Sequence, residues 1–166
     1  MPTDKVYLVG FMGAGKSTLA RRLAGRLGWR AEDVDDRIEA LEGRSVRTIF
    51  SEQGEPYFRQ VERRVLLSLL PLRHVVVATG GGTFVDPDNR ALIKRDGLSV
   101  WLDVPLSQLV DRIPPDGRRP LAADRAQFER LFEARRAAYS QAHVRLDAGH
   151  APVDALVEQL LDRLET

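Results

Sequence analysis

The residues with the clearest chemical meaning form one loop near the N-terminus, Gly10-Phe11-Met12-Gly13-Ala14-Gly15-Lys16-Ser17-Thr18. Their spacing, G-x-x-x-x-G-K-[ST], is that of a loop that cradles nucleotide phosphates. The glycines let backbone N–H groups turn toward an anion, the lysine reaches the β- and γ-phosphates, and the first hydroxyl binds Mg²⁺. A glycine-rich turn that happens to contain a lysine is the alternative. The apolar run before the loop and the helical pattern after it favour a nucleoside triphosphate site.

Two acidic residues, Asp33 and Asp35, follow within a segment over residues 29–35 that we expect to be extended. Their spacing would place both carboxylates on one face of a strand. One carboxylate could then hold Mg²⁺ through water while the other accepts the proton of an acceptor alcohol. The alternative is a pair of surface or helix-capping acids. Asp36 is the favoured cap of the helix expected from about residue 36 to 41.

Arg59 and a run of three glycines are further candidates for substrate binding. Arg59 lies one turn into an amphipathic helix expected over residues 55–70 and could pair with a substrate carboxylate. An ion pair with Glu62, three residues on, is the alternative. Gly80-Gly81-Gly82 follows an apolar run and has a high entropic cost, so we expect another group to approach that backbone closely. A loose turn remains possible.

The segment from Arg112 to Leu121 combines three arginines with prolines and a glycine between two predicted helices. Closure of such a flap could exclude water and bring an arginine onto the phosphates. A solvated loop is the alternative.

The elements that must position these residues alternate between strands and helices. Apolar or β-branched runs predict strands at residues 5–9, 29–35, 74–79, 98–102 and 143–146, with helical patterns between them. Such alternation is typical of an α/β fold with a parallel sheet. Ligands of these sheets bind beyond the carboxyl ends of the strands. The phosphate loop, the two aspartates and the three glycines should therefore converge on one crevice.

Length and composition indicate one ordinary globular domain. The chain has 166 residues, of which 43% are hydrophobic and 30% charged, and its net charge is +1. No apolar stretch is long enough to cross a membrane, and the charge offers no global field for nucleic acid. The chain has no cysteine, which excludes disulfides and thiolate metal sites. With no signal-peptide core visible, we expect a cytoplasmic protein.

Taken together and in order, the motifs resemble those of shikimate kinases. They are the phosphate loop followed by D-V-D-D-R-I-E, G-R-S-V-R-T-I-F, G-E-P-Y-F-R-Q-V-E, T-G-G-G and G-R-R-P-L. The resemblance implies a fold like that of nucleoside monophosphate kinases, with a five-stranded parallel sheet in the order 2-3-1-4-5 flanked by helices. It also implies one kinase domain over residues 1–166, with a shikimate-binding region at about 33–62 and a lid at about 112–124.

The resemblance assigns a role to each candidate residue. Catalysis would rest on Lys16, Asp35 and Arg119, and the metal would be held by Ser17 and, through water, by Asp33. Shikimate would contact Asp35, Arg59, Gly80, Gly81, Gly82 and Arg135. ATP would contact Gly13, Ala14, Gly15, Lys16, Ser17, Thr18, Arg112, Arg119 and Pro152, with Arg112 and Pro152 on either side of adenine. Two assignments stay open, because Arg136 adjoins Arg135 and Arg118 adjoins Arg119.

The implied reaction is the ATP- and Mg²⁺-dependent phosphorylation of the 3-hydroxyl of shikimate, giving shikimate 3-phosphate and ADP in aromatic amino acid biosynthesis. The implied partners are these small molecules, with no nucleic acid or membrane, and the implied state is a monomer. Two alternatives remain open. One is a kinase of similar fold for another polar acid, such as gluconate, and the other is a regulatory ATP-binding module without turnover. The D-x-D and F-R-x-x-E motifs argue against a passive binder.

Overall fold

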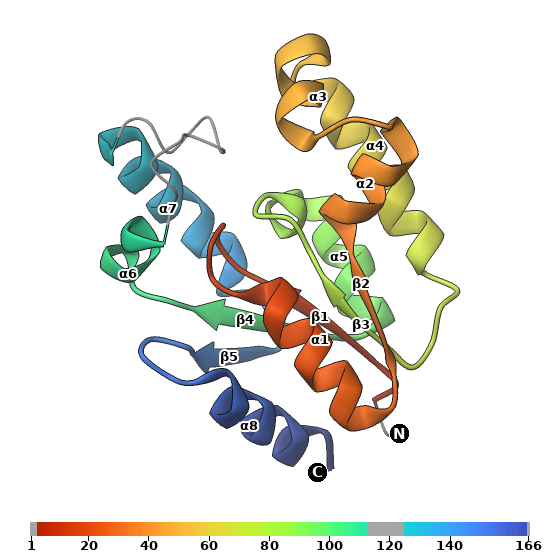
Figure 1. The fold of residues 1–166 in the computed structure, drawn as a ribbon, viewed down its shortest axis with the longest axis vertical. Helices are drawn as coiled ribbons and strands as arrows, with labels where there is room; N and C mark the ends of the chain where they lie inside the picture. The colour runs from red at the N-terminus through yellow and green to blue at the C-terminus, as the bar shows by residue number, and fades with distance from the viewer. Residues whose placement is uncertain (1–2, 113–124, 166) are drawn as a thin grey trace.

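The computed structural model describes residues 3–112 and 125–165. Its centre is a five-stranded parallel sheet in the order β2-β3-β1-β4-β5 (Figure 1), which confirms the predicted fold class and strand order. The central strand, which follows the N-terminus, and the neighbour that ends at the three glycines are buried on both faces, as expected for apolar runs in a parallel sheet. The strands are β1 (Lys5–Val9), β2 (Arg30–Asp33), β3 (Val75–Ala78), β4 (Leu98–Asp103) and β5 (Val144–Asp147).

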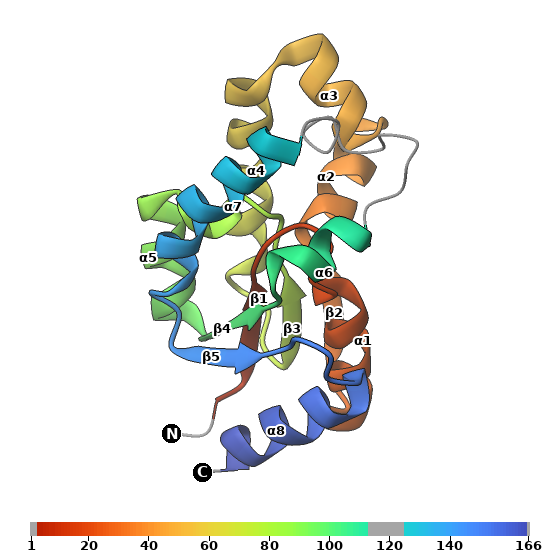
Figure 2. The same cartoon turned by 90° about the vertical axis from the view of Figure 1, so that its left-hand side faces the viewer.

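Helices pack on both sides of the sheet. Helices α1 and α8 lie side by side on one side, and α5 and α7 lie on the other (Figure 2). Helices α2, α3 and the start of α4 lie together at one end of the molecule (Figure 1). The described helices are α1 (Lys16–Leu27), α2 (Val34–Glu42), α3 (Val46–Gln53), α4 (Glu55–Leu69), α5 (Pro87–Asp96), α6 (Leu106–Asp111), α7 (Arg125–Tyr139) and α8 (Val153–Glu165), with a short 3₁₀ helix η1 (Thr83–Val85) before α5.

The start of α2 corrects the sequence prediction for residues 29–35. The strand ends at Asp33, and Asp35 lies in the first turn of α2 rather than on a strand. Asp33, not Asp36, is the N-cap, and its Oδ1 accepts the backbone N–H of Asp36 at 3.1 Å. The helix begins early because a capping aspartate followed by two acidic residues stabilises the positive end of a helix. Asp33 and Asp35 therefore do not share a strand face.

The other helix boundaries agree with the local sequence signals. Gly28 ends α1 with φ of 69°, in the left-handed region that favours glycine. The Ser45 hydroxyl caps α3 by accepting the N–H of Thr48 at 3.1 Å, and serine is among the residues most favoured at this position. Pro56 lies in the first turn of α4, where a missing N–H costs nothing. Within the residues that the structure describes, no helix is both long and apolar enough to span a membrane.

Candidate active site

The phosphate loop joins the carboxyl end of β1 to the start of α1. Gly13 and Gly15 have φ of 82° and 98°, a backbone that residues with a side chain rarely adopt. Gly15 precedes α1 without a side-chain cap, so the first N–H groups of the helix face the loop. The buried Lys16 ammonium donates to the carbonyls of Gly10 and Phe11 at 2.6 and 2.9 Å. The loop is thus built to hold an anion.

Ser17 and Asp33 meet beside this loop. The Ser17 hydroxyl donates to Oδ2 of Asp33, while Oδ1 of the same carboxylate caps α2. A hydroxyl and a carboxylate side by side are hard oxygen ligands, the kind that Mg²⁺ prefers together with phosphate and water oxygens. Among residues 3–112 and 125–165, no group of three or more His, Asp or Glu side chains could hold a metal. This pair therefore fits a cation that shares its shell with a nucleotide.

The three glycines after β3 each face a different side chain. A Cβ atom on Gly80 would lie 2.8 Å from Oδ1 of Asp35, and one on Gly81 would lie 3.1 Å from a terminal nitrogen of Arg135. A Cβ atom on Gly82 would lie 2.7 Å from a terminal nitrogen of Arg59. One carboxylate and two guanidiniums therefore approach the glycine backbone closely, as the sequence predicted. These contacts exclude a loose turn.

The Arg59 guanidinium is held in place by the carboxylate of Glu62, one turn further along α4. Its Nη1 donates to both oxygens of Glu62 at 3.1 Å, and the Glu62 side chain is only 1% exposed. Glu62 also accepts the Thr83 hydroxyl at 2.8 Å, and that hydroxyl accepts the N–H of Gly80 at 2.9 Å. The ion pair given as the alternative role for Arg59 thus exists. It also aims the guanidinium, so the two roles are compatible.

Arg135 lies against the same turn from α7. Burial lowers the pKa of its guanidinium below the ordinary value, and the nearby positive charge of Arg59 acts in the same direction. The guanidinium lies 5.9 Å from the centre of the Phe11 ring. Arg136, by contrast, is exposed. Arg135 is thus a largely buried cation beside a second guanidinium, and a bound anion there would stabilise both charges.

Tyr139 fastens the turn to α7. Its hydroxyl donates to the carbonyl of Gly81, and burial raises the pKa of Tyr139 to about 12. The phenol therefore remains protonated and able to donate at neutral pH.

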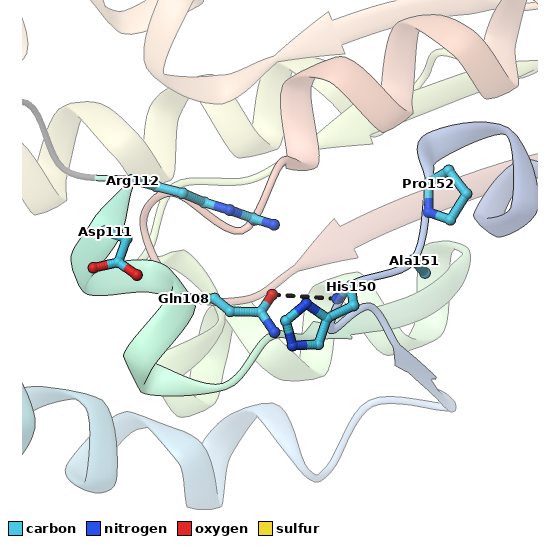
Figure 3. Close-up of a pocket in the computed structure, with 6 residues that line it drawn as sticks. All are labelled: Gln108, Asp111, Arg112, His150, Ala151 and Pro152. Carbon is cyan, nitrogen blue, oxygen red and sulfur yellow. Dashed lines mark hydrogen bonds between the residues drawn. The ribbon is translucent and has the colours of Figure 1, made fainter.

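A separate cavity of about 580 Å³ lies behind the phosphate loop (Figure 3). Arg112 and Pro152, the predicted pair around adenine, lie on opposite sides of it. The Arg112 guanidinium donates to the carbonyl of Gly13 at 3.1 Å, which places this cavity next to the phosphate site. Its other lining residues are Gln108, Asp111, His150 and Ala151.

The structure brings most of the predicted residues together at the carboxyl edge of the sheet. One region is surrounded by the phosphate loop, the three glycines, Asp33, Asp35, Arg59 and Arg135. The pocket lined by Arg112 and Pro152 lies beside it. Arg118 and Arg119 lie outside the described residues. Sequence reasoning missed Thr83, Tyr139 and the burial of Glu62, although the F-R-x-x-E spacing placed Glu62 one turn from Arg59.

Comparison with known proteins agrees with this geometry. The family model described as shikimate kinase matches residues 12–165. A shikimate kinase of Persephonella marina is 42% identical over 161 residues, covering 96% of this chain and 98% of that protein. Among solved structures, shikimate kinase from Acinetobacter baumannii in complex with shikimate has a TM-score of 0.93 and 33% identity, covering 98% of this chain and 93% of that one. Shikimate kinase from Aquifex aeolicus has a TM-score of 0.87 and 34% identity, with coverages of 97% and 96%.

Proposed function

Because the chain belongs to the shikimate kinase family, we propose that it transfers the γ-phosphate of ATP to the 3-hydroxyl of shikimate at the site described above. It is an enzyme and a kinase. The observation that supports the substrate most directly is the turn at Gly80–Gly82, where one carboxylate and two guanidiniums converge. A small acid that carries both a hydroxyl and a carboxylate matches that set of groups.

The donor half of the reaction belongs to the phosphate loop. The loop N–H groups and the start of α1 bind the phosphates, and Lys16 exchanges its carbonyl partners for β- and γ-phosphate oxygens. Ser17 and Asp33 would hold Mg²⁺, Asp33 through water. When bound, the ion neutralises charge on the transferring phosphoryl group. The remaining contribution of the protein is alignment, because phosphoryl transfer needs positioning more than covalent help.

The acceptor half belongs to Asp35, Arg59 and Arg135. The two guanidiniums bind the substrate carboxylate, and Glu62 fixes the direction of the first of them. That binding orients the hydroxyl toward Asp35, whose carboxylate accepts its hydrogen bond and, as the phosphoryl group transfers, its proton. Arg119 is proposed to meet the phosphate from the lid at about residues 112–124. The kinase is further proposed to act as one domain over residues 1–166, as a monomer and in the cytoplasm.

The direct test is product formation from ATP, Mg²⁺ and shikimate. The expected result is ADP release that depends on shikimate, with a phosphate ester at the 3-position identified by phosphorus NMR. A panel of other hydroxylated acids, including gluconate, serves as the specificity control. Turnover with another acid but not with shikimate would overturn the substrate assignment. ATP binding without any acceptor-dependent ADP release would instead support a regulatory module.

A further inference from the structure

The loop between β5 and α8 forms one wall of the cavity behind the phosphate loop, and its backbone is unusual at His150. His150 has φ of 60°, in the left-handed region that few residues other than glycine adopt. Two residues later the loop presents Pro152 to the cavity and runs into α8. Such a conformation persists only where neighbouring contacts maintain it. The contacts of His150 therefore help to fix the conformation of this loop.

A single side chain from α6 holds the His150 backbone. Oε1 of Gln108 accepts the N–H of His150 at 3.2 Å, across 42 residues of sequence (Figure 3). Because a backbone N–H only donates, the atom that faces it must be the amide oxygen, and this decides the orientation of the amide. The loop is also tied to the end of β4, where the backbone carbonyl of Asp103 accepts the N–H of Ala148 at 3.0 Å. At the other end of the loop, the carbonyl of Pro152 accepts the N–H groups of Ala155 and Leu156 in α8 at 3.1 and 3.3 Å. Gln108 holds the backbone between these two anchors.

Gln108 also lies on α6, the helix that leads to Arg112 on the opposite side of the cavity. It precedes Arg112, the residue that caps the end of α6, by four residues. The two side chains therefore lie on the same face of the helix. Arg112 in turn is tied to the phosphate loop through the carbonyl of Gly13. Figure 3 shows the bond between Gln108 and His150 at the pocket that Arg112 and Pro152 also line. The amide of Gln108 therefore links α6, which leads to Arg112, with the loop that carries Pro152.

We propose that Gln108 is a positioning residue for the nucleotide. It holds His150 in the left-handed conformation and thereby keeps Pro152 at the distance from Arg112 that admits a planar base. The inference rests on the proposed function in one respect, that the base of ATP occupies this cavity. Without the amide, the backbone at His150 relaxes to commoner conformations, and only a fraction of molecules keep a slot that accepts the base. The apparent affinity for ATP falls by that fraction.

The first test compares two ligands by calorimetric titration, ATP and inorganic triphosphate, which has no base. In Gln108→Ala we expect ATP to bind about tenfold more weakly, while the affinity for triphosphate stays within about twofold of the parent. Gln108→Glu keeps an acceptor oxygen and is expected to stay within about threefold of the parent for ATP. An unchanged ATP affinity in Gln108→Ala overturns the proposal, as do equal losses for both ligands or equal losses in both variants.

The second test asks whether the backbone conformation is the cause. His150→Gly makes a positive φ inexpensive, so Gln108→Ala combined with His150→Gly should regain ATP affinity to within about threefold of the parent. His150→Ala is the matched control, because it also removes the imidazole but leaves the conformation costly, and it should not restore binding. Equal recovery with alanine would overturn the backbone explanation. These measurements need no turnover, so a failure of the kinase assignment would show separately, as absent shikimate-dependent ADP release in the parent.

Discussion

At the scale of single residues, the contacts that each charged side chain makes within the protein set its direction before any ligand binds. Lys16 contacts two loop carbonyls, and Arg59 contacts Glu62, so both cations are already aimed by the protein. The residue types in the motifs made Lys16, Asp35 and Arg59 candidates, because phosphates, hydroxyls and carboxylates are bound by such groups, and the structure places all three around one region. Glu62 was not predictable as a buried residue, since a carboxylate on a charged helix face is usually solvated, and its contact with the Thr83 hydroxyl of η1 exists only in the folded chain.

Lys16 is the first residue whose removal has a clear expected outcome. Lys16→Ala should lower kcat by about 10³-fold or more, because a positioned charge on the transferring phosphate is lost. The melting temperature should change little. The measurement is steady-state ADP release beside thermal unfolding, with Lys94→Ala, an exposed lysine on α5, as the matched control. A folded Lys16→Ala protein that retained near-full turnover would contradict the role given to the phosphate loop.

Arg59 provides a test of the acceptor half. Arg59→Ala should raise the KM for shikimate by roughly 30- to 100-fold, the loss expected when a paired carboxylate loses a guanidinium. The KM for ATP should stay near the parent value, since the Arg59 guanidinium pairs with Glu62 and faces Gly82, on the acceptor side of the proposed site. Arg64→Ala, which removes an exposed arginine from the same helix, is the control and should leave both constants unchanged. An unaltered KM for shikimate would remove Arg59 from the site.

At the scale of elements, the sheet brings together groups that lie far apart in the chain. β1 leads to the phosphate loop, β2 to Asp33 and α2, and β3 to the three glycines. Periodicity predicted these strands and most helices because apolar spacing reports burial directly. The strand predicted over residues 29–35 extends too far, because β2 ends at Asp33 and α2 begins at the next residue. Propensity could not show that Asp33 caps α2, since capping is decided by where the backbone turns and not by residue type alone.

The turn at Gly80–Gly82 gives a prediction that belongs to this scale. A Cβ atom on Gly82 would lie 2.7 Å from the Arg59 guanidinium, so Gly82→Ala should displace that side chain and raise the KM for shikimate about tenfold. Gly25→Ala is the matched control, because a Cβ atom there meets nothing within 4 Å inside α1. It should instead stabilise the protein by about 1 kcal/mol, because alanine favours a helix more than glycine. Equal KM values for shikimate in the two variants would contradict this account of the turn.

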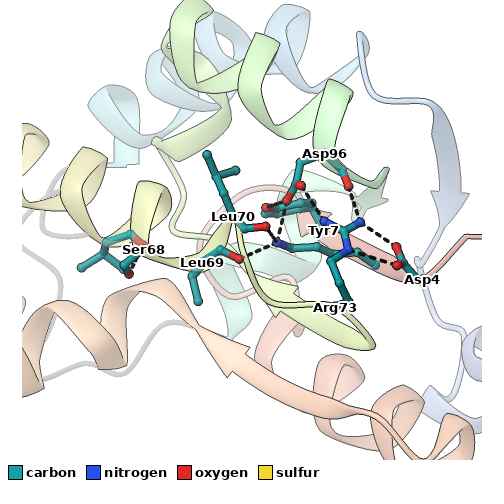
Figure 4. Close-up of polar contacts among 9 residues, drawn as sticks. Asp4, Tyr7, Ser68, Leu69, Leu70, Arg73 and Asp96 are labelled. Atoms are coloured by element: carbon teal, nitrogen blue, oxygen red, sulfur yellow. Dashed lines mark hydrogen bonds and ion pairs between the residues drawn. The ribbon is translucent and has the colours of Figure 1, made fainter.

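At the scale of the whole molecule, a polar network surrounds the amino-terminal end of the central strand β1, whereas the site lies at the carboxyl end (Figure 4). The fully buried Lys5 ammonium donates to the carbonyl of Leu69 at 2.5 Å and pairs with Asp96 at 2.6 Å. The Tyr7 hydroxyl donates to the same carboxylate at 2.6 Å, and Arg73 pairs with it at 2.8 Å. The network joins β1, the end of α4 and the end of α5. The sequence did not predict this network, because the partners of Lys5 come from α4 and α5, and only the packing of these helices brings them next to β1.

The network predicts how stability depends on pH. Burial alone would raise the pKa of Asp96, but hydrogen bonds from Lys5, Tyr7 and Arg73 outweigh it and lower the pKa below the ordinary value of 3.8. The folded state therefore binds the proton of this carboxyl more weakly than the unfolded state does. The stabilisation from Asp96 is present above pH ~3.8 and is lost as the pH falls through the lower, folded-state value.

Asp96→Asn tests this directly, because the amide keeps the shape of the side chain and removes its charge. At pH 7 the free energy of unfolding should fall by about 3 kcal/mol, since Lys5 is left as a buried charge without its carboxylate. Below pH ~4 the gap between variant and parent should narrow, because the parent loses the same charge by protonation. Urea unfolding at several pH values measures both effects. Asp154→Asn, in an ion pair whose aspartate side chain is 83% exposed, is the control and should stay within about 0.5 kcal/mol of the parent. A gap for Asp96→Asn that did not vary with pH would show that lost packing, and not the carboxylate charge, accounts for the change.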